Sequence, residues 1–165
     1  SGLPTDVAKE AEPLFARARD VSDNPTPSGT MCLVAALRLT GLLSDRADFI
    51  ARADQAALTV RGLAVASPRF AGAALVDLLV ADEARTGLGP AVAAVVTDDP
   101  LSDLARATWR MAPIGTAVLV GRSGTAGFGD RLKAEDGLVH VCRGTTCFAP
   151  TADLAELRTA LWSRA

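Results

Sequence analysis

Ala91-Val92-Ala93-Ala94-Val95-Val96 is an uninterrupted apolar run, and its short length and its valines predict a β-strand. A helix is expected to begin at Asp99-Pro100, and a second valine-rich run occupies residues 116–120. Strand, helix and strand in this order predict two parallel strands joined by a right-handed crossover. We therefore expect the run to lie in a small sheet covered by helices.

A third strand and a last helix are predicted on the C-terminal side of this unit. The third strand is expected at residues 138–142, and Thr151 or Asp153 can cap the last helix. The glycine-rich stretch at residues 121–129 lacks the ending of a P-loop, so we interpret it as a connection. Residues 89–165 are thus predicted to form a small α/β subdomain with a short, mostly parallel sheet.

The apolar pattern is helical on the N-terminal side of the run. Ser28 can cap a helix to about Thr40, and the near absence of a polar face on this helix predicts burial on most sides. Ser44 is expected to begin a second helix with arginines on its outer side, and Ser67-Pro68 a third. Residues 1–88 are therefore predicted to form an array of helical hairpins, which makes the chain α+β.

Composition argues against several classes of protein. A net charge of -2 and the lack of tyrosine offer a nucleic acid neither a basic field nor stacking partners. The longest apolar run, residues 31–37, is far shorter than the roughly 20 residues that cross a bilayer. Three cysteines are too few for a disulfide scaffold and favour a reducing compartment. We expect a cytoplasmic protein that binds neither nucleic acid nor membrane.

The motif Asp23-Asn24-Pro25-Thr26-Pro27-Ser28-Gly29 precedes the first predicted helix. Its prolines favour extended backbone, and the free amides of the helix start favour an anion or a sugar hydroxyl. Asp23, Asn24 and Ser28 are therefore weak candidates for catalysis, as hydrogen-bonding or acid/base groups. The favoured alternative is a stiff turn whose polar side chains bond their own backbone. Glycoside chemistry would need a second carboxylate, which the sequence does not place beside Asp23.

The motif Val141-Cys142-Arg143-Gly144-Thr145-Thr146-Cys147 carries two thiols near the last helix. In a straight strand their Cα atoms would lie about 16 Å apart, beyond the roughly 7 Å limit of a disulfide, so joint chemistry requires a turn. Three interpretations stay open: idle structural thiols, which we favour, a reversible disulfide, and a metal site. Cys142 and Cys147 are thus redox candidates, and no metal or cofactor site is predicted.

Two further side chains are interpreted as structural. His140 is the single histidine of the chain, and its place in a predicted strand favours a hydrogen-bonded structural residue over a catalyst. Cys32 lies within the apolar helix and is interpreted as inert packing. Neither residue completes a serine-histidine-acid set.

The two motifs and the segments around them resemble, in identity and order, a known family. It is the thioredoxin-domain-containing family of bacterial YyaL-like proteins and spermatogenesis-associated protein 20, whose C-terminal region resembles residues 11–165. Pro25, Thr30 and His140 stand where that family more often has a small residue, Asn and an aromatic residue. The matching segments are Ala11-Glu12-Pro13-Leu14, Arg17-Ala18-Arg19-Asp20 leading into the Asp23 motif, Ser67-Pro68, and Val141-Cys142-Arg143-Gly144 with Cys147 and Pro150.

The resemblance implies a thioredoxin-like domain followed by an α/α toroid similar to six-hairpin glycosidases and N-acylglucosamine epimerases. Residues 1–88 would be the last hairpins of that toroid, a partial α/α toroid whose partner is an upstream polypeptide with the remaining domains. One implied function is that of a fragment or subunit contributing Asp23, Asn24 and Ser28 to a carbohydrate-type pocket. The alternative is a non-catalytic interaction or structural module that packs against partner helices.

Overall fold

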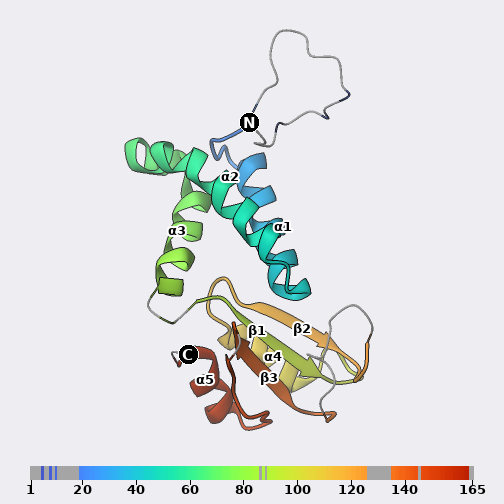
Figure 1. The fold of residues 1–165 in the computed structure, drawn as a ribbon. Helices are drawn as coiled ribbons and strands as arrows, with labels where there is room; N and C mark the ends of the chain where they lie inside the picture. Colours follow the sequence, from blue (N-terminus) through green and yellow to red (C-terminus); the bar gives the residue numbers. More distant parts are fainter. Residues whose placement is uncertain are drawn as a thin grey trace. The chain divides into compact units, whose positions relative to one another are not determined.

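The computed structural model describes residues 5, 8, 10, 19–85, 87, 89–125, 135–144 and 146–163, with the backbone alone at 83–85. The chain divides into two compact units, Ser1–Leu79 and Val80–Ala165. Helices form the first unit, and a sheet with helices forms the second (Figure 1). The predicted α+β class is confirmed.

The first unit contains the three predicted helices and one short 3₁₀ turn. They are α1 (Gly29–Ser44), α2 (Ala47–Ala66), η1 (Pro68–Phe70) and α3 (Gly72–Arg85), whose last residues continue past the division between the units. The prediction that Ser67-Pro68 begins the third helix is wrong, because Pro68 begins the 3₁₀ turn and the helix starts at Gly72. Helices α1 and α2 lie side by side and run in opposite directions (Figure 1). In the described part of the chain, no helix has both the length and the apolar character needed to cross a membrane.

Helix α1 begins as predicted and ends later. The Ser28 hydroxyl accepts the backbone N–H of Met31 at 3.3 Å, which is the N-cap arrangement. The prediction that Ser44 begins the second helix is wrong, because Ser44 is the last residue of α1 and its hydroxyl donates to the Thr40 carbonyl at 2.6 Å. Asp45 then takes a left-handed conformation, with φ 52°, which turns the chain toward α2.

The core of the first unit lies between α1 and α2, with Ala71, which follows η1, and Ala74 of α3 added. Helix α1 contributes one side of its surface, so the prediction of burial on most sides is wrong for this chain. Helix α2 contributes small residues, and its predicted outer arginines, Arg46, Arg52 and Arg61, are exposed. The buried residues are Met31, Val34, Ala53, Ala56, Val60, Ala64, Ala71 and Ala74.

A charged group ties the three helices together. The Arg38 guanidinium on α1 donates to both carboxylate oxygens of Asp77 on α3, at 2.5 and 3.0 Å, and to Asp54 on α2 at 2.7 Å. Burial acts to lower the pKa of Arg38, but the hydrogen bonds that its guanidinium donates to Asp77 and Asp54 outweigh it and raise that pKa. Arg38 therefore stays charged and fixes the helices relative to one another.

The second unit is a mixed sheet with a helix pair on one face. The elements are β1 (Ala91–Val96), α4 (Asp103–Met111), β2 (Ala117–Gly121), β3 (Val139–Arg143), β4 (Thr146–Cys147) and α5 (Leu154–Trp162). Along the sheet the strands of the described chain have the order β2-β1-β3-β4. Ser102 caps α4 through its hydroxyl, so this helix begins at Asp103, four residues after the predicted Asp99. Asp153, one of the two predicted caps, caps α5.

The sheet contains the predicted parallel pair, but the prediction of a mostly parallel sheet is wrong. Strands β1 and β2 are parallel, whereas β3 is antiparallel to β1 and β4 is antiparallel to β3. The last residue of β2, Gly121, lies beside Val96 at the end of β1, and the Gly137 N–H donates to the Val96 carbonyl. Strand β3 therefore starts beside the C-terminal end of β1 and runs back along it, antiparallel to β1.

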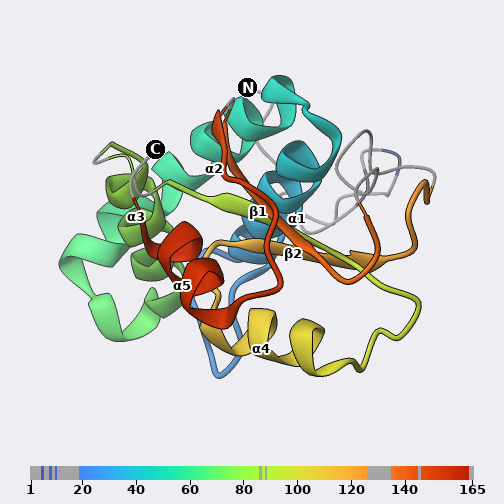
Figure 2. The same ribbon diagram turned by 90° about the horizontal axis from the view of Figure 1, so that it is seen from below.

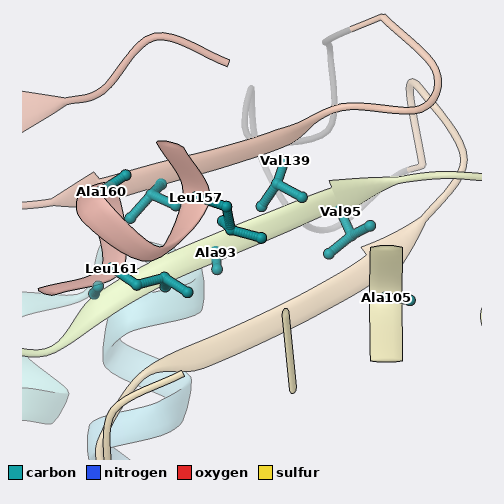
Figure 3. Close-up of a cluster of buried hydrophobic side chains, with 9 residues drawn as sticks. Ala93, Val95, Ala105, Val139, Leu157, Ala160 and Leu161 are labelled. Carbon is teal, nitrogen blue, oxygen red and sulfur yellow. The ribbon is translucent and has the colours of Figure 1, made fainter. Parts of the chain in front are cut away.

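The core of the second unit lies between the sheet and the helices α4 and α5. Both helices lie on the same face of the sheet (Figure 2). Alternate residues of β1 and β3 point toward them, and Figure 3 shows these side chains meeting Leu157 and Leu161 of α5. The predicted inward positions of the last helix at these two leucines are confirmed. The cluster comprises Ala91, Ala93, Val95, Ala105, Val139, Val141, Leu157, Ala160 and Leu161.

Candidate functional site

Asp23 forms hydrogen bonds with three backbone groups, one just before α1 and two around the start of α3. Its carboxylate accepts the N–H of Ser28 at 2.9 Å through Oδ1 and the N–H of Ala73 at 2.8 Å through Oδ2. Its own N–H donates to the Phe70 carbonyl at 2.8 Å. Both carboxylate oxygens therefore stabilise helix starts, that of α1 and that of α3.

Ser28 and Asn24 lie in opposite environments. Ser28 is fully buried, and its hydroxyl is the cap of α1. Asn24 is exposed, and its backbone N–H donates to the Thr26 carbonyl at 3.0 Å, across a cis Asn24–Pro25 bond. Of the three catalytic candidates, Asn24 is the one whose side chain faces solvent. The loop is thus anchored at its buried end by Ser28 and exposes Asn24 at its tip.

A second carboxylate also reaches the start of α1. Asp20 accepts the Gly29 N–H through Oδ2 at 3.5 Å, and its carbonyl accepts the Thr30 hydroxyl at 2.8 Å. Asp20 and Asp23 thus bond consecutive amides of one helix start. Among the described residues, no group of three His, Cys, Asp or Glu side chains is arranged to hold a metal ion. The arrangement stabilises the helix and brings no acid/base pair to a common substrate position.

The structure joins Cys142 and Cys147 in a disulfide. The required turn is present: Gly144 has φ 54°, and β4 folds back so that Cys147 pairs with Cys142, with 4.0 Å between Cα atoms. The Phe148 N–H donates to the Val141 carbonyl at 2.9 Å, which places the cysteine pair at the neighbouring, non-hydrogen-bonded position. Side chains are closest at that position of an antiparallel ladder.

The three cysteines differ in exposure. Cys147 is exposed on the edge strand β4, whereas Cys142 is half-buried on β3. Cys32 is a free thiol and is exposed on α1, so its interpretation as packing is wrong: it lies on the side of the helix opposite the core. Its thiol donates a weak hydrogen bond to the Pro27 carbonyl at 3.8 Å.

His140 lies in β3 on the same face as Cys142, because side chains two residues apart share a face of a strand. Burial lowers its pKa, which favours the neutral imidazole. Its Nε2 atom is buried and has no hydrogen-bond partner among the described residues. The expectation that His140 is a hydrogen-bonded structural residue is therefore not met at Nε2.

Arg143 is a buried residue whose role sequence reasoning missed. Its guanidinium donates to the backbone carbonyls of Gly89 and Leu161, and to that of Ser163 at 3.1 Å. These bonds hold the end of α5, where helical carbonyls lack partners and the helix dipole favours a cation. Alternation with Val139 and Val141 was the available signal, because it places Arg143 on the inward face of β3.

The glycine-rich connection is described as far as Thr125, and residues 126–134 lie outside the described residues. Arg122 pairs with Asp98 at 2.8 Å, and both side chains are largely exposed. Such a pair contributes little to stability.

No family model matches this chain, and no curated protein and no solved structure matches it either.

Proposed function

We propose that this chain is a non-catalytic interaction module that packs against partner helices. The observation that carries the proposal is the outer face of α1, here called the α1 strip. The strip is made of apolar residues that are all exposed: Cys32, Leu33, Ala35, Ala36 and Leu39.

The residues of the α1 strip are neighbours on the helix surface. Ala36 lies three residues from Leu33 and three from Leu39, and Ala35 lies four from Leu39. The opposite side of α1 is buried against its own unit through residues such as Met31 and Val34. A helix that is apolar on both sides is normally covered on both sides, so the strip fits a second helical surface.

Helix α3 carries a similar exposed group. Leu75, Val76 and Leu79 are 37%, 43% and 65% exposed, and spacings of three and four residues make them neighbours. Large apolar side chains at adjacent positions are a more specific feature than single exposed leucines. They support the same kind of partner, a packed helix.

The family resemblance supplies a candidate for the partner. We propose that it is an upstream polypeptide with a thioredoxin-like domain and the remaining helices of an α/α toroid, in a cytoplasmic protein of the YyaL-like kind. The α1–α2 hairpin and the following α3 support this reading, because hairpins of this type are the repeating unit of such toroids.

Binding to that polypeptide tests the proposal. The polypeptide encoded directly upstream in the same reading frame is titrated with this chain in a calorimeter. Leu39→Glu places a charge in the α1 strip and should weaken binding at least about tenfold, because an unpaired charge is costly to bury. Leu58→Glu is the matched control, since Leu58 is 63% exposed on α2 outside the strip, and it should bind like the unmodified chain.

Two results would contradict the proposal. One is the absence of any binding between the chain and its upstream sequence, or the absence of such a sequence. The other is an equal loss of binding in Leu39→Glu and Leu58→Glu, which would show that the α1 strip has no special part.

A contribution to a carbohydrate-type pocket is the second candidate. It is favoured by the exposed tip of the Asp23 loop, Asn24 to Pro27, which is anchored by buried Ser28 and by Asp23. An anchored loop can hold the Asn24 amide in place for a sugar hydroxyl. In the full-length protein, Asn24→Ala should then weaken oligosaccharide binding without changing stability. Unchanged binding would rule out this role for Asn24.

A further inference from the structure

We propose that Cys142 and Cys147 form a reversible redox couple, which thiols open by attack at Cys147 and which closes again with the strand pairing retained. This inference concerns a different surface from the α1 strip. It stands independently of the proposed interaction function.

Access to the disulfide is unequal on its two sides. Cys147 is exposed and lies in β4, the edge strand of the sheet, which has two residues. Cys142 is half-buried between β1 and β4, where it pairs with Val92 on one side and with Cys147 on the other. An incoming thiolate can therefore approach Cys147 more readily, and access is one of the factors that decide which sulfur is attacked.

Backbone hydrogen bonds hold the two cysteines together without the disulfide. On the far side of Cys147, the Phe148 N–H donates to the Val141 carbonyl at 2.9 Å. Further along, Val139 and Thr151 exchange two backbone hydrogen bonds, at 2.9 and 3.1 Å. The segment from β4 to Thr151 thus stays paired with β3 when the sulfurs separate. A reduced pair held in register can close again in an intramolecular step.

The disulfide closes a short loop, with a sequence separation of 5. The entropy that a cross-link removes from the unfolded chain grows with loop length, so this bond constrains the unfolded state less than most disulfides do. The second unit also has its own core between the sheet and α5. Reduction is therefore compatible with the folded state, as a working redox couple requires.

The exchange is balanced by two equivalents of a low-molecular-weight thiol such as glutathione. A thiolate attacks Sγ of Cys147, the sulfur–sulfur bond breaks, and Cys142 leaves as a thiolate that takes up a proton. A second thiolate attacks the glutathione sulfur of the mixed disulfide, which releases oxidised glutathione and the Cys147 thiol. The protein pair is reduced by two electrons, two glutathione thiols are oxidised, and oxidised glutathione reverses both steps.

The test uses the full chain with Cys32→Ala, because Cys32 is a free, exposed thiol that would form its own mixed disulfide. The native protein is equilibrated in buffers of graded reduced-to-oxidised glutathione ratio, thiols are trapped by alkylation, and the two forms are counted by intact mass. We expect a change from mostly oxidised to mostly reduced within the ratios that cells maintain. A pair that stays oxidised at every ratio until the chain is denatured, or that never oxidises, would overturn the proposal.

A second measurement assigns the attacked sulfur. In the Cys32→Ala background, Cys142→Ala leaves Cys147 alone, and Cys147→Ala leaves Cys142 alone. Oxidised glutathione should modify the exposed Cys147 several-fold faster than the half-buried Cys142, with circular dichroism confirming that both variants are folded. Equal rates, or a faster reaction at Cys142, would overturn the assignment of attack to Cys147.

Discussion

The carboxylate of Asp23 accepts the backbone N–H of Ala73 at 2.8 Å, across a sequence separation of 50 residues. Ala73 is the second residue of α3, and the other oxygen of Asp23 bonds the Ser28 N–H ahead of α1. One side chain therefore supplies an acceptor to two helix starts. Asp23, a catalytic candidate on the basis of its motif, therefore has a clear structural role.

Asp23→Ala should destabilise the first unit by about 2–4 kcal/mol, because each helix start loses a charged acceptor. Urea unfolding followed by circular dichroism measures this change. Asp20→Ala is the control, since Asp20 is exposed and its 3.5 Å bond to the Gly29 N–H is long, and it should cost less than about 1 kcal/mol. Equal costs in the two variants would contradict the assigned role of Asp23.

Two glycines in helices should respond to alanine in opposite directions. A Cβ on Gly41 would lie 2.7 Å from Cγ1 of Ile50 and 3.0 Å from the Arg46 carbonyl oxygen, so α1 and the start of α2 would have to separate. We expect Gly41→Ala to cost about 1–3 kcal/mol, despite the higher helix propensity of alanine.

Gly62 on α2 supplies the comparison for Gly41. A Cβ at Gly62 would meet nothing within 4 Å, so Gly62→Ala should stabilise the chain by about 0.5–1 kcal/mol. Thermal unfolding of both variants beside the unmodified chain gives the two signs. A stabilising Gly41→Ala would show that α1 and α2 are packed less closely at Gly41 than these distances require.

Local signals in the sequence predicted much of the fold. The Ser28 cap, the valine-rich strands and the inward leucines of the last helix are all features of a few adjacent residues, and each is found. The start of α2 was misplaced because a serine can cap a following helix or bond back to the preceding one. Ser44 does the second, and the left-handed Asp45 that follows it ends α1.

The sheet direction and the polar contacts depended on residues far apart in sequence. Nothing near residue 138 indicates that β3 starts beside Val96 at the end of β1, so the antiparallel order could not be read from strand patterns alone. The Asp23–Ala73 bond is long-range for the same reason. The alternation of side chains along β3 indicates that Arg143 points inward. The carbonyls that accept its hydrogen bonds lie far from it in the sequence, so they could not be predicted.

His140 should make stability depend on pH. Burial lowers its pKa below the ordinary 6.5, so the folded chain binds this proton less tightly than the unfolded chain. The stabilising effect is present above about pH 6.5 and is lost as pH falls through the lowered pKa of the folded state. His140→Phe removes the titration, so its stability relative to the unmodified chain should rise as pH falls below about 6.5. A difference that is constant between about pH 5 and 8 would contradict this.

Arg143 should stabilise the end of α5 more than any other part of the chain. It is 6% exposed, and its guanidinium donates to carbonyls of Gly89, Leu161 and Ser163. Arg143→Leu leaves these carbonyls without that donor, at a cost of about 2–4 kcal/mol. Arg143→Lys keeps the charge near the helix end but cannot reproduce the planar set of donors, so we expect a smaller loss.

Amide hydrogen exchange can locate this effect within α5. In Arg143→Leu, the amides of α5 should exchange faster than in the unmodified chain, with Arg143→Lys between them, because the helix end opens more often. The amides of α1 belong to the other unit and serve as the internal control. Faster exchange spread equally over α1 and α5 would show a general loss of stability and would contradict a capping role, since a cap acts on the turn that it contacts.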